Sequence, residues 1–556
     1  MKQRVKRYLP KSESSIELQL GQTSLSGLLV DISLSGLSFL TSDDVGSIED
    51  EVGKARLKVG TEIFEIGKVI VTRQRPFNQA LSSSQLHDAD DEMRGMELIA
   101  IRTLSDYIPV EKFMKFLSND GKSPFEFELA HGKFTLADFN TPTGSDDILE
   151  KTLVITKMQE AWKKKGSYQY ERYRQPSKGT RITLDMVRSN NRKDFLSFGS
   201  NDYLGFASHP EVIQAAKDAL DEYGVGATGS AVSSGLSLEH KKLNNQLAGM
   251  FQKESSLLYN SGYTANVGII GALCKDRDLV LYDKICHTSI QDGIIFATAN
   301  GATCIPFKHN DPAHLESLLL EHRNKYNGCL VVTEGIFSMD GDIAALSEIV
   351  PVSKRYNARI FLDSAHDFGV IGENGLGAAE YHSVITEIDL IMGTFSKIAG
   401  GIGGFVVGTH ESIEYLRMMS RPHIFSVSMP PSMAAAATKA LQIFASEKEH
   451  LNTLKANIRF FVKGLRALGV PMSATHQSSI CPVLVGDESK LEIMTGILYE
   501  NGIHTTPVVY PVVSRSKCRF RFTVTALHTQ SDLDYALLVL KMAFEKVGLH
   551  SVKNAA

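Results

Sequence analysis

The chain has 556 residues, of which 43% are hydrophobic and 22% charged, and its formal net charge is −4. This length is too great for one compact core, so we expect two or three domains. The near-neutral charge argues against a nucleic-acid polymer as the main partner. The six cysteines are scattered without a CxxC pair or zinc-ligand spacing, which predicts free thiols in a reducing compartment and no metal site.

The N-terminal sequence is basic, but the apolar segment of a secretory signal does not follow it. No stretch reaches the roughly 18 consecutive apolar residues that a membrane span requires. We therefore expect a cytoplasmic protein without a transmembrane segment.

Residues 14–101 have the pattern of a β-rich domain. Runs of alternating or clustered apolar residues with the length of strands occupy 15–20, 27–32, 55–59 and 65–71. The segment 138–147 is rich in Pro, Gly and Asp, as linkers are. These patterns predict an N-terminal domain over residues 1–118 and a linker over 119–147.

After this linker the pattern changes, and segments typical of strands alternate with segments typical of helices. The clearest strands are 279–282, 329–333, 359–362, 389–392 and 405–407. Their apolar runs are continuous, as expected where helices cover both faces of a parallel sheet. We expect an α/β region over 148–556, with a large domain at about 190–425 and a small C-terminal α+β domain at about 426–550.

Three of these strands lead into side chains suited to pyridoxal phosphate (PLP) chemistry. They are followed by Asp283-Lys-Ile-Cys-His287, Asp363-Ser-Ala-His366 and Gly393-Thr-Phe-Ser-Lys397. The carboxyl ends of parallel strands meet at one edge of a sheet. PLP needs a lysine to hold it, a carboxylate at its pyridine nitrogen, a flat group against its ring and donors for its phosphate. Lys397, Asp363 and His287 suit the first three tasks, and the backbone N–H groups of Ser261, Gly262 and Tyr263, which open a predicted helix, suit the fourth.

Each of these residues also has a plainer interpretation. A lysine after Thr-Phe-Ser is usually a solvated surface residue, and an aspartate at a strand end often caps a helix. A single histidine is more often structural than catalytic. The prediction of a PLP site depends on their order and common position.

Further short segments occur in the order of a known enzyme family: Ser200-Asn-Asp-Tyr-Leu-Gly205, Gly226-Ala-Thr-Gly229, Tyr259-Asn-Ser-Gly-Tyr263, Glu334-Gly-Ile-Phe-Ser-Met-Asp-Gly341, Arg421-Pro-His-Ile-Phe-Ser426 and Ala526-Leu-His-Thr529. With the strand-end segments, they make residues 193–547 resemble the α-oxoamine synthases. This family of fold-type-I PLP enzymes includes serine palmitoyltransferase, 8-amino-7-oxononanoate synthase and 2-amino-3-ketobutyrate CoA ligase. The resemblance implies the same fold, PLP as cofactor and a homodimer with a shared active site.

The resemblance also implies roles for individual residues. Lys397 would hold PLP and remove the Cα proton of the amino acid, Asp363 would contact the pyridine nitrogen, and His287 would stack on the ring. His366 would contact the PLP phenolic oxygen or the substrate. The remaining implied contacts are Thr394 and, from a partner subunit, Ser426 or Ser428 for the phosphate, Ser338 beside the cofactor, and Asn201 and Arg521 for the substrate carboxylate, with Arg519 as the weaker candidate.

The family's reaction joins the Cα of a small amino acid to the acyl carbon of a thioester, with release of the thiol and CO₂, and yields an α-amino ketone. The segments Gly393-Thr-Phe-Ser-Lys397 and Met429-Pro-Pro-Ser432 are most similar to the serine palmitoyltransferase branch. The segment Thr505-Thr-Pro-Val-Val-Tyr-Pro511 departs from that branch, so the amino acid stays open, as does the choice between acyl-CoA and acyl-carrier protein. Two alternatives are an aminotransferase and a signalling or scaffold protein with an inactive PLP domain; the joint presence of Lys397, Asp363, His287 and Arg521 argues against the second.

Near the N-terminus, Asp31-Ile-Ser-Leu-Ser-Gly36 fits the [D/N]-x-S-x-x-G element of PilZ domains, and Arg94-Gly-Met-Glu-Leu-Ile99 resembles their closing strand. PilZ domains are small β-barrels that often bind cyclic di-GMP. The ligand residues would be Arg4, Arg7, Asp31, Ser33 and Gly36, because guanidinium groups suit guanine edges and phosphates. The usual arm motif is R-x-x-x-R, whereas these arginines are three residues apart, and the six-residue element also suits a β-turn with a capping Asp. Cyclic di-GMP binding and regulation therefore stay open.

Overall fold

The computed structural model describes residues 172–185, 192–473, 475–510 and 512–549, the backbone of six N-terminal strands, and residues 149, 152, 156 and 159. The chain divides into two compact units, Met1–Tyr170 and Glu171–Ala556. The predicted linker 119–147 and the two arginines Arg4 and Arg7 lie outside the described residues.

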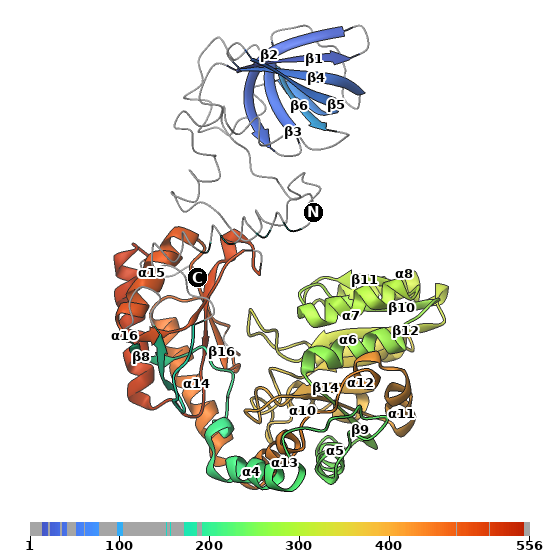
Figure 1. Cartoon of the computed structure of the whole chain (residues 1–556), viewed down its shortest axis with the longest axis vertical. Coiled ribbons are helices and arrows are strands. Elements are labelled where there is room, and N and C mark those ends of the chain that lie inside the picture. The colour runs from blue at the N-terminus through green and yellow to red at the C-terminus, as the bar shows by residue number, and fades with distance from the viewer. Residues whose placement is uncertain are drawn as a thin grey trace. The chain divides into compact units, whose positions relative to one another are not determined.

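The first unit contains a closed barrel of six antiparallel strands in the order β1-β2-β3-β6-β5-β4 (Figure 1). The strands are β1 (Ser14–Leu20), β2 (Thr23–Ser33), β3 (Gly36–Thr41), β4 (Val52–Val59), β5 (Glu62–Pro76) and β6 (Glu97–Thr103). The four predicted strands are confirmed as β1, β2, β4 and β5. Within the PilZ-like element, Ser33 pairs with Gly36 and Asp31 with Ser38, so the element spans the hairpin between β2 and β3.

The second unit is built on a seven-stranded sheet in the order β11-β10-β12-β13-β14-β15-β9 (Figure 1). The strands are β9 (Ser255–Tyr259), β10 (Asp278–Asp283), β11 (Thr303–Phe307), β12 (Gly328–Glu334), β13 (Arg359–Asp363), β14 (Leu390–Thr394) and β15 (Gly404–Gly408). Strand β15 runs antiparallel to both of its neighbours, β14 and β9, and the other six strands share one direction. The five strands that the sequence predicts here are confirmed, and the mostly parallel sheet agrees with the expected fold class.

Helices surround this sheet because its central strands are apolar on both faces. They are α4 (Pro210–Tyr223), α5 (Leu238–Met250), α6 (Gly262–Leu273), α7 (Thr288–Ala299), α8 (Pro312–His322), α9 (Leu346–Arg355), α10 (Ala378–Tyr381), α11 (His410–Met419), α12 (Arg421–Ile424) and α13 (Pro431–Ser446). The helix α13 packs against α4 and α5. Helix α6 begins shortly after β9, at the edge of the sheet where the parallel strands have their carboxyl ends.

The C-terminal part adds two three-stranded sheets, β16-β19-β18 and β17-β8-β7. Their strands are β7 (Arg181–Asp185), β8 (Arg192–Ser197), β16 (Ile480–Leu484), β17 (Ile503–His504), β18 (Thr506–Val508) and β19 (Arg519–Thr523), and they pack with α14 (Glu449–Ala467), α15 (Glu488–Glu500) and α16 (Gln530–Lys546). Because β8 pairs with β17, residues that precede the large sheet in sequence belong to this C-terminal part.

In the described part of the chain, no helix is both long enough and apolar enough to span a membrane. The same residues contain no group of three or more His, Cys, Asp or Glu side chains arranged to bind a metal ion.

The large sheet's core is testable at Ile391, whose side chain is fully buried in β14 opposite Leu362 of β13 and Val407 of β15. We expect Ile391→Ala to lower the free energy of unfolding by about 2–5 kcal/mol, because the truncated side chain leaves a cavity. Denaturant titration of the purified variant measures this. The control is Leu320→Ala on α8, where the side chain is 71% exposed; equal losses in both variants would contradict the assignment of β14 to the core.

Candidate active site

Four neighbouring parallel strands end in polar residues at one edge of the sheet. Their last residues are Asp283 of β10, Glu334 of β12, Asp363 of β13 and Thr394 of β14. Glu334 and Asp363 are direct register partners. All four side chains are buried. The edge therefore gathers three carboxyl groups in a place that water reaches poorly, which makes a nearby cation favourable.

Asp363 is held in a defined orientation by two donors. Its Oδ1 accepts a hydrogen bond from the backbone N–H of Ala365 at 2.8 Å, and its Oδ2 accepts one from Asn266 Nδ2 of α6 at 2.7 Å. The side chain is 4% exposed. Both contacts fix the direction of the two carboxyl oxygens, as a group that faces the ring nitrogen of PLP requires.

His287 is connected to Asp363 through a chain of hydrogen bonds. Asn266 Nδ2 also contacts Ser289 Oγ at 2.9 Å, and Ser289 Oγ contacts His287 Nδ1 at 2.8 Å. His287 forms the N-cap of α7, and its backbone N–H donates to Glu334. Burial lowers the pKa of His287, which favours the neutral imidazole. Sequence reasoning found both ends of this chain but missed Asn266 and Ser289, although Ser289 follows His287 by only two residues.

Lys397 follows β14 in the turn at the same edge. Burial lowers the pKa of its ammonium group to about 8, while the Asp363 and Glu334 carboxyl groups act in the opposite direction. Burial and the neighbouring Asp363 raise the pKa of Glu334 well above its ordinary value. A lysine that loses its proton near neutral pH is suited to act as a nucleophile or base. The sequence motif contained Glu334, but only the structure reveals that it adjoins Asp363 and acts on Lys397.

His366 lies in the turn after β13 and is 7% exposed. Its Nδ1 contacts the hydroxyl of Tyr203 at 2.6 Å. Burial, together with the cations Lys397 and Arg521, lowers the pKa of His366 well below its ordinary value. Burial raises the pKa of Tyr203 to about 12, so this hydroxyl keeps its proton. Tyr203 lies in the quoted segment 200–205, but its sequence context gave no sign of this contact.

Arg521 enters the site from β19 of the C-terminal part. Its Nη1 donates to Asn201 Oδ1 at 3.2 Å, and its Nε donates to the backbone carbonyl of Ser338 at 2.8 Å. Arg521, Asn201 and Ser338 come from distant segments of the sequence, and the structure brings them into contact, as the sequence predicts. Arg519 instead pairs with Asp340 at 2.7 Å and with the carbonyl of Met339 at 3.0 Å.

The N-terminus of α6 faces β14. Ser261 caps the helix, with its Oγ accepting from the backbone N–H of Thr264 at 3.1 Å. The N–H groups of Gly262 and Tyr263 have no partner within the helix because they belong to its first turn. A Cβ on Gly262 would lie 3.1 Å from the Cβ of Thr394, so glycine permits this close approach. The Tyr263 side chain points outward to Asp292, which leaves its backbone as the relevant group.

Ser426 and Ser428 lie between α12 and α13, away from the strand ends in sequence. Ser426 is half-buried, whereas Ser428 is 9% exposed and its Oγ has no partner within the described residues. Phe425 and Val427 beside them are 79% and 52% exposed.

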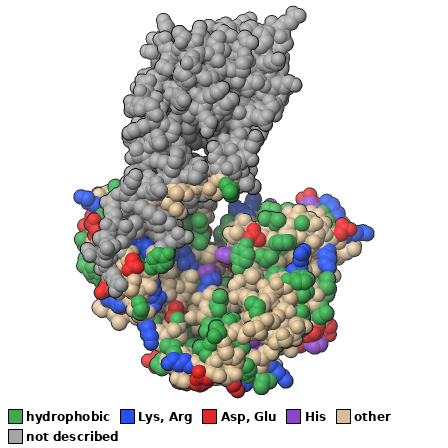
Figure 2. All heavy atoms as spheres, viewed as in Figure 1, with side chains coloured by type: hydrophobic (Ala, Val, Ile, Leu, Met, Phe, Trp, Pro, Cys, Tyr) green, Lys and Arg blue, Asp and Glu red, His purple; other side chains and the backbone are tan. Residues whose placement is uncertain are grey.

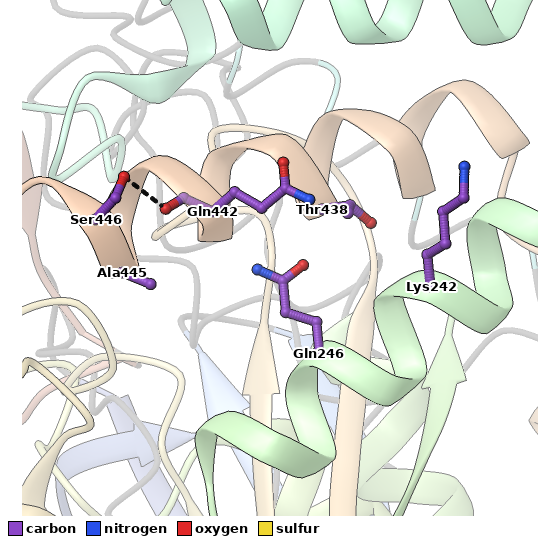
Figure 3. A pocket seen from close by; sticks show the side chains of 6 residues that line it. All are labelled: Lys242, Gln246, Thr438, Gln442, Ala445 and Ser446. Atoms are coloured by element: carbon purple, nitrogen blue, oxygen red, sulfur yellow. Dashed lines mark hydrogen bonds between the residues drawn. The ribbon is translucent and has the colours of Figure 1, made fainter.

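The surface at the site carries histidine and basic side chains. In Figure 2 these side chains (purple and blue) gather in the hollow at the centre of the face, between the C-terminal part and the large sheet. A second, shallow groove lies between α5 and α13 and is lined by Lys242, Gln246, Thr438, Gln442, Ala445 and Ser446 (Figure 3). Its Lys242 ammonium pairs with Glu239 at 2.6 Å. None of the predicted site residues lines this groove.

Residues 193–540 match the family model of class I and II aminotransferases. The chain belongs to this family. It is 38% identical over 359 residues to 8-amino-7-oxononanoate synthase of Treponema denticola, a match that covers 65% of this chain and 90% of the relative. It is 37% identical over 393 residues to serine palmitoyltransferase of Sphingobacterium spiritivorum, covering 71% and 96%. The solved structure of Sphingomonas wittichii serine palmitoyltransferase superposes with a TM-score of 0.68 at 31% identity, covering 73% of this chain and all of that one.

These relatives confirm the resemblance to α-oxoamine synthases, so this member of the family is a PLP-dependent C-acyltransferase. The family match begins at residue 193 and says nothing about the N-terminal barrel. The residues present fit PLP. They offer an amine of lowered pKa, a buried and oriented carboxylate, and a glycine that brings the N-terminus of α6 against the Thr394 side chain.

The lowered pKa of Lys397 predicts how PLP loading depends on pH. Only the neutral amine attacks the cofactor's aldehyde, so we expect the rate of covalent PLP incorporation into the cofactor-free enzyme to rise with pH and to level off above about pH 8. Stopped-flow absorbance measures this rate. The control is Nα-acetyl-lysine, whose amine has an ordinary pKa and whose rate should continue to rise to about pH 10. A plateau for the enzyme only at that higher pH would contradict the lowered pKa of Lys397.

Proposed function

We propose that this enzyme condenses a small amino acid with an acyl thioester, releasing the thiol and CO₂ and forming an α-amino ketone. The observation that carries this proposal is the meeting of Lys397, the oriented carboxylate Asp363 and Arg521 at one sheet edge. Relatives named 8-amino-7-oxononanoate synthase and serine palmitoyltransferase support it, since the first name denotes a product with an amino and an oxo group and the second denotes acyl transfer to an amino acid. The segments 393–397 and 429–432 are most similar to the serine palmitoyltransferase branch, while segment 505–511 departs from it, so the proposal leaves the amino acid open.

When bound, PLP draws electrons away from the Cα of the attached amino acid and so makes its proton acidic. In the proposed site, Lys397 holds the cofactor and afterwards accepts the Cα proton at Nζ. Asp363 keeps the pyridine nitrogen protonated, and the hydrogen bonds from Ala365 and Asn266 orient it for that task. His287 would stack on the ring, and its lowered pKa favours the neutral imidazole for that role.

The substrate carboxylate is assigned to Arg521 and Asn201. The guanidinium of Arg521 donates from Nε to the carbonyl of Ser338 and from Nη1 to Asn201 Oδ1 and Thr523 Oγ1, which fixes its orientation in the site. Ser338 holds Arg521 through its backbone carbonyl, and its side chain would lie beside the cofactor. His366, oriented by Tyr203, is assigned to the phenolic oxygen of PLP or to the substrate.

For the cofactor's phosphate we propose Thr394, the first turn of α6 at Ser261, Gly262 and Tyr263, and Ser426 or Ser428 of a second copy of the chain. A helix N-terminus attracts anions through its free N–H groups and dipole. The exposed apolar side chains of Phe425 and Val427 support the burial of this segment in a homodimer with a shared active site.

For the N-terminal barrel we propose a PilZ-like domain that binds cyclic di-GMP and regulates the enzyme. The six-stranded barrel and the position of Asp31, Ser33 and Gly36 in the hairpin between β2 and β3 support this proposal. Arg4 and Arg7 would supply the arm that grips the guanine edges and phosphates.

The reaction class is tested by a matrix of amino acids against acyl-CoA chain lengths and acyl-carrier protein, with and without cyclic di-GMP. We expect thiol and CO₂ release for at least one pair. Formation of a keto acid without thiol release would instead support an aminotransferase. Turnover that does not change with cyclic di-GMP would contradict the proposed regulation.

The role of Lys397 is tested by Lys397→Ala. This variant should lose all measurable turnover and the absorbance band of the lysine-bound cofactor, because no other amine replaces Nζ. Lys439→Ala on α13, where the lysine pairs with Glu211 at 3.6 Å, is the control that should keep both. Normal turnover of Lys397→Ala would remove the central assignment.

The role of Arg521 is tested by Arg521→Ala. We expect the KM for the amino acid to rise by about 10²-fold, because the loss of a charge-assisted hydrogen bond to a bound carboxylate costs about 1.5–3 kcal/mol, while the KM for the thioester changes little. The control is Arg359→Ala at the other end of β13, where the arginine pairs with Asp389 at 2.7 Å. Equal increases in both KM values would contradict specific carboxylate binding by Arg521.

A further inference from the structure

Both arginines of β19 donate hydrogen bonds to the loop 338–342. Arg521 Nε donates to the carbonyl of Ser338, and Arg519 Nη1 donates to the carbonyl of Met339 and to Asp340 Oδ1. The loop also approaches β16 closely, since a Cβ on Gly341 would lie 2.5 Å from the carbonyl oxygen of Ile480. The position of Arg521 therefore depends on the position of this loop.

On its other side the loop is attached to the large sheet through His309. The imidazole Nδ1 lies 3.0 Å from Asp283 Oδ2, and Nε2 lies 3.0 Å from Asp342 Oδ2. A carboxylate only accepts hydrogen bonds, so two such contacts require an N–H on both ring nitrogens. The geometry thus describes an imidazolium between two carboxylates, one fully buried at the end of β10 and the other in the loop.

The surroundings of His309 strengthen this attachment. Burial by itself lowers its pKa, but the hydrogen bonds to Asp283 and Asp342 outweigh burial and raise the pKa to about 9. The ring packs edge-on against Phe337 with centroids 4.5 Å apart. The next residue, Asn310, donates from its backbone to Asp283 Oδ2 at 2.7 Å, and from Nδ2 to the carbonyl of Ile343 at 2.9 Å and to Asp342 Oδ2 at 3.3 Å.

We propose that His309, clamped between Asp283 and Asp342, is a positioning residue that holds loop 338–342 where it orients Arg521 toward the carboxylate of the amino acid. This inference rests on the role of Arg521 proposed above. His309 itself touches neither Arg521 nor any other residue assigned to the substrate. It acts through the loop, and the sheet end at Asp283 supplies the rigid support.

The test is His309→Asn. The N–H donors of asparagine lie on a single nitrogen, so they cannot span the two carboxylates that lie at opposite nitrogens of the imidazole. We expect the KM for the amino acid and its Kd, read from the change in cofactor absorbance on binding, to rise about tenfold, because a displaced Arg521 loses part of its charge-assisted hydrogen bond to the carboxylate. The KM for the acyl thioester should stay within about twofold. The matched control is His322→Asn, whose histidine contacts the exposed Glu321 at 3.2 Å and should leave all three values unchanged.

Two further measurements separate positioning from a general structural role. In the double variant His309→Asn with Asp342→Asn, the amino-acid KM should be no higher than in His309→Asn alone, because both changes break the His309–Asp342 contact and the asparagine carbonyl at position 342 still accepts from Asn310 Nδ2. Hydrogen exchange of residues 335–345, followed by mass spectrometry, should become faster in His309→Asn and stay unchanged in His322→Asn. Additive losses in the double variant, or unchanged exchange in His309→Asn, would overturn the clamp.

The outcomes also distinguish this inference from the proposed function. If Arg521→Ala raises the amino-acid KM while His309→Asn does not, the clamp is wrong and the role of Arg521 stands. If Arg521→Ala leaves that KM unchanged, Arg521 does not bind the substrate carboxylate. The proposed effect of His309 on substrate binding is then contradicted as well. If His309→Asn raises the KM for the thioester as much as the KM for the amino acid and also loses bound cofactor, a specific positioning role is likewise contradicted.

Discussion

The site depends on one constraint, which is that adjacent parallel strands end together at the same edge of the sheet. This geometry forces the side chains that follow β10, β12, β13 and β14 into a shared volume, whatever their separation in sequence. Here that volume receives the carboxyl groups of Asp283, Glu334 and Asp363, all buried. Like charges at such proximity are unfavourable unless cations or hydrogen-bond donors balance them. Most features of the site follow from this requirement.

The carboxyl groups are balanced in different ways. Asp363 receives two hydrogen bonds that satisfy its oxygens, whereas burial and the neighbouring Asp363 raise the pKa of Glu334. Asp283 is paired with His309. The ammonium of Lys397 is the remaining charged group beside these carboxyl groups. Its burial lowers its pKa by more than the carboxyl groups raise it, so the pKa falls to about 8. A lysine that loses its proton near neutral pH is thus a consequence of the packing around the sheet edge.

The C-terminal part completes the site from outside the large sheet. Strand β19 brings Arg521 to Asn201 and to the carbonyl of Ser338, so three distant segments meet at one guanidinium. The loop that receives the two β19 arginines is tied on its far side to the sheet end through His309. The relative position of the C-terminal part and the large sheet therefore decides where the guanidinium of Arg521 lies.

The sequence alone determined the elements and the chemical identity of the site. Continuous apolar runs identified five strands of the large sheet, and the motifs after them singled out Lys397, Asp363 and His287, because backbone pattern and motif spacing are local properties. Only the tertiary structure decided which side chains meet and how they are charged. The link from Asp363 through Asn266 and Ser289 to His287, the contact of Tyr203 with His366, and the clamp at His309 each join segments that are far apart in sequence. Burial and neighbouring charges, which set the pKa values of Lys397 and Glu334, exist only after the strands have been brought together.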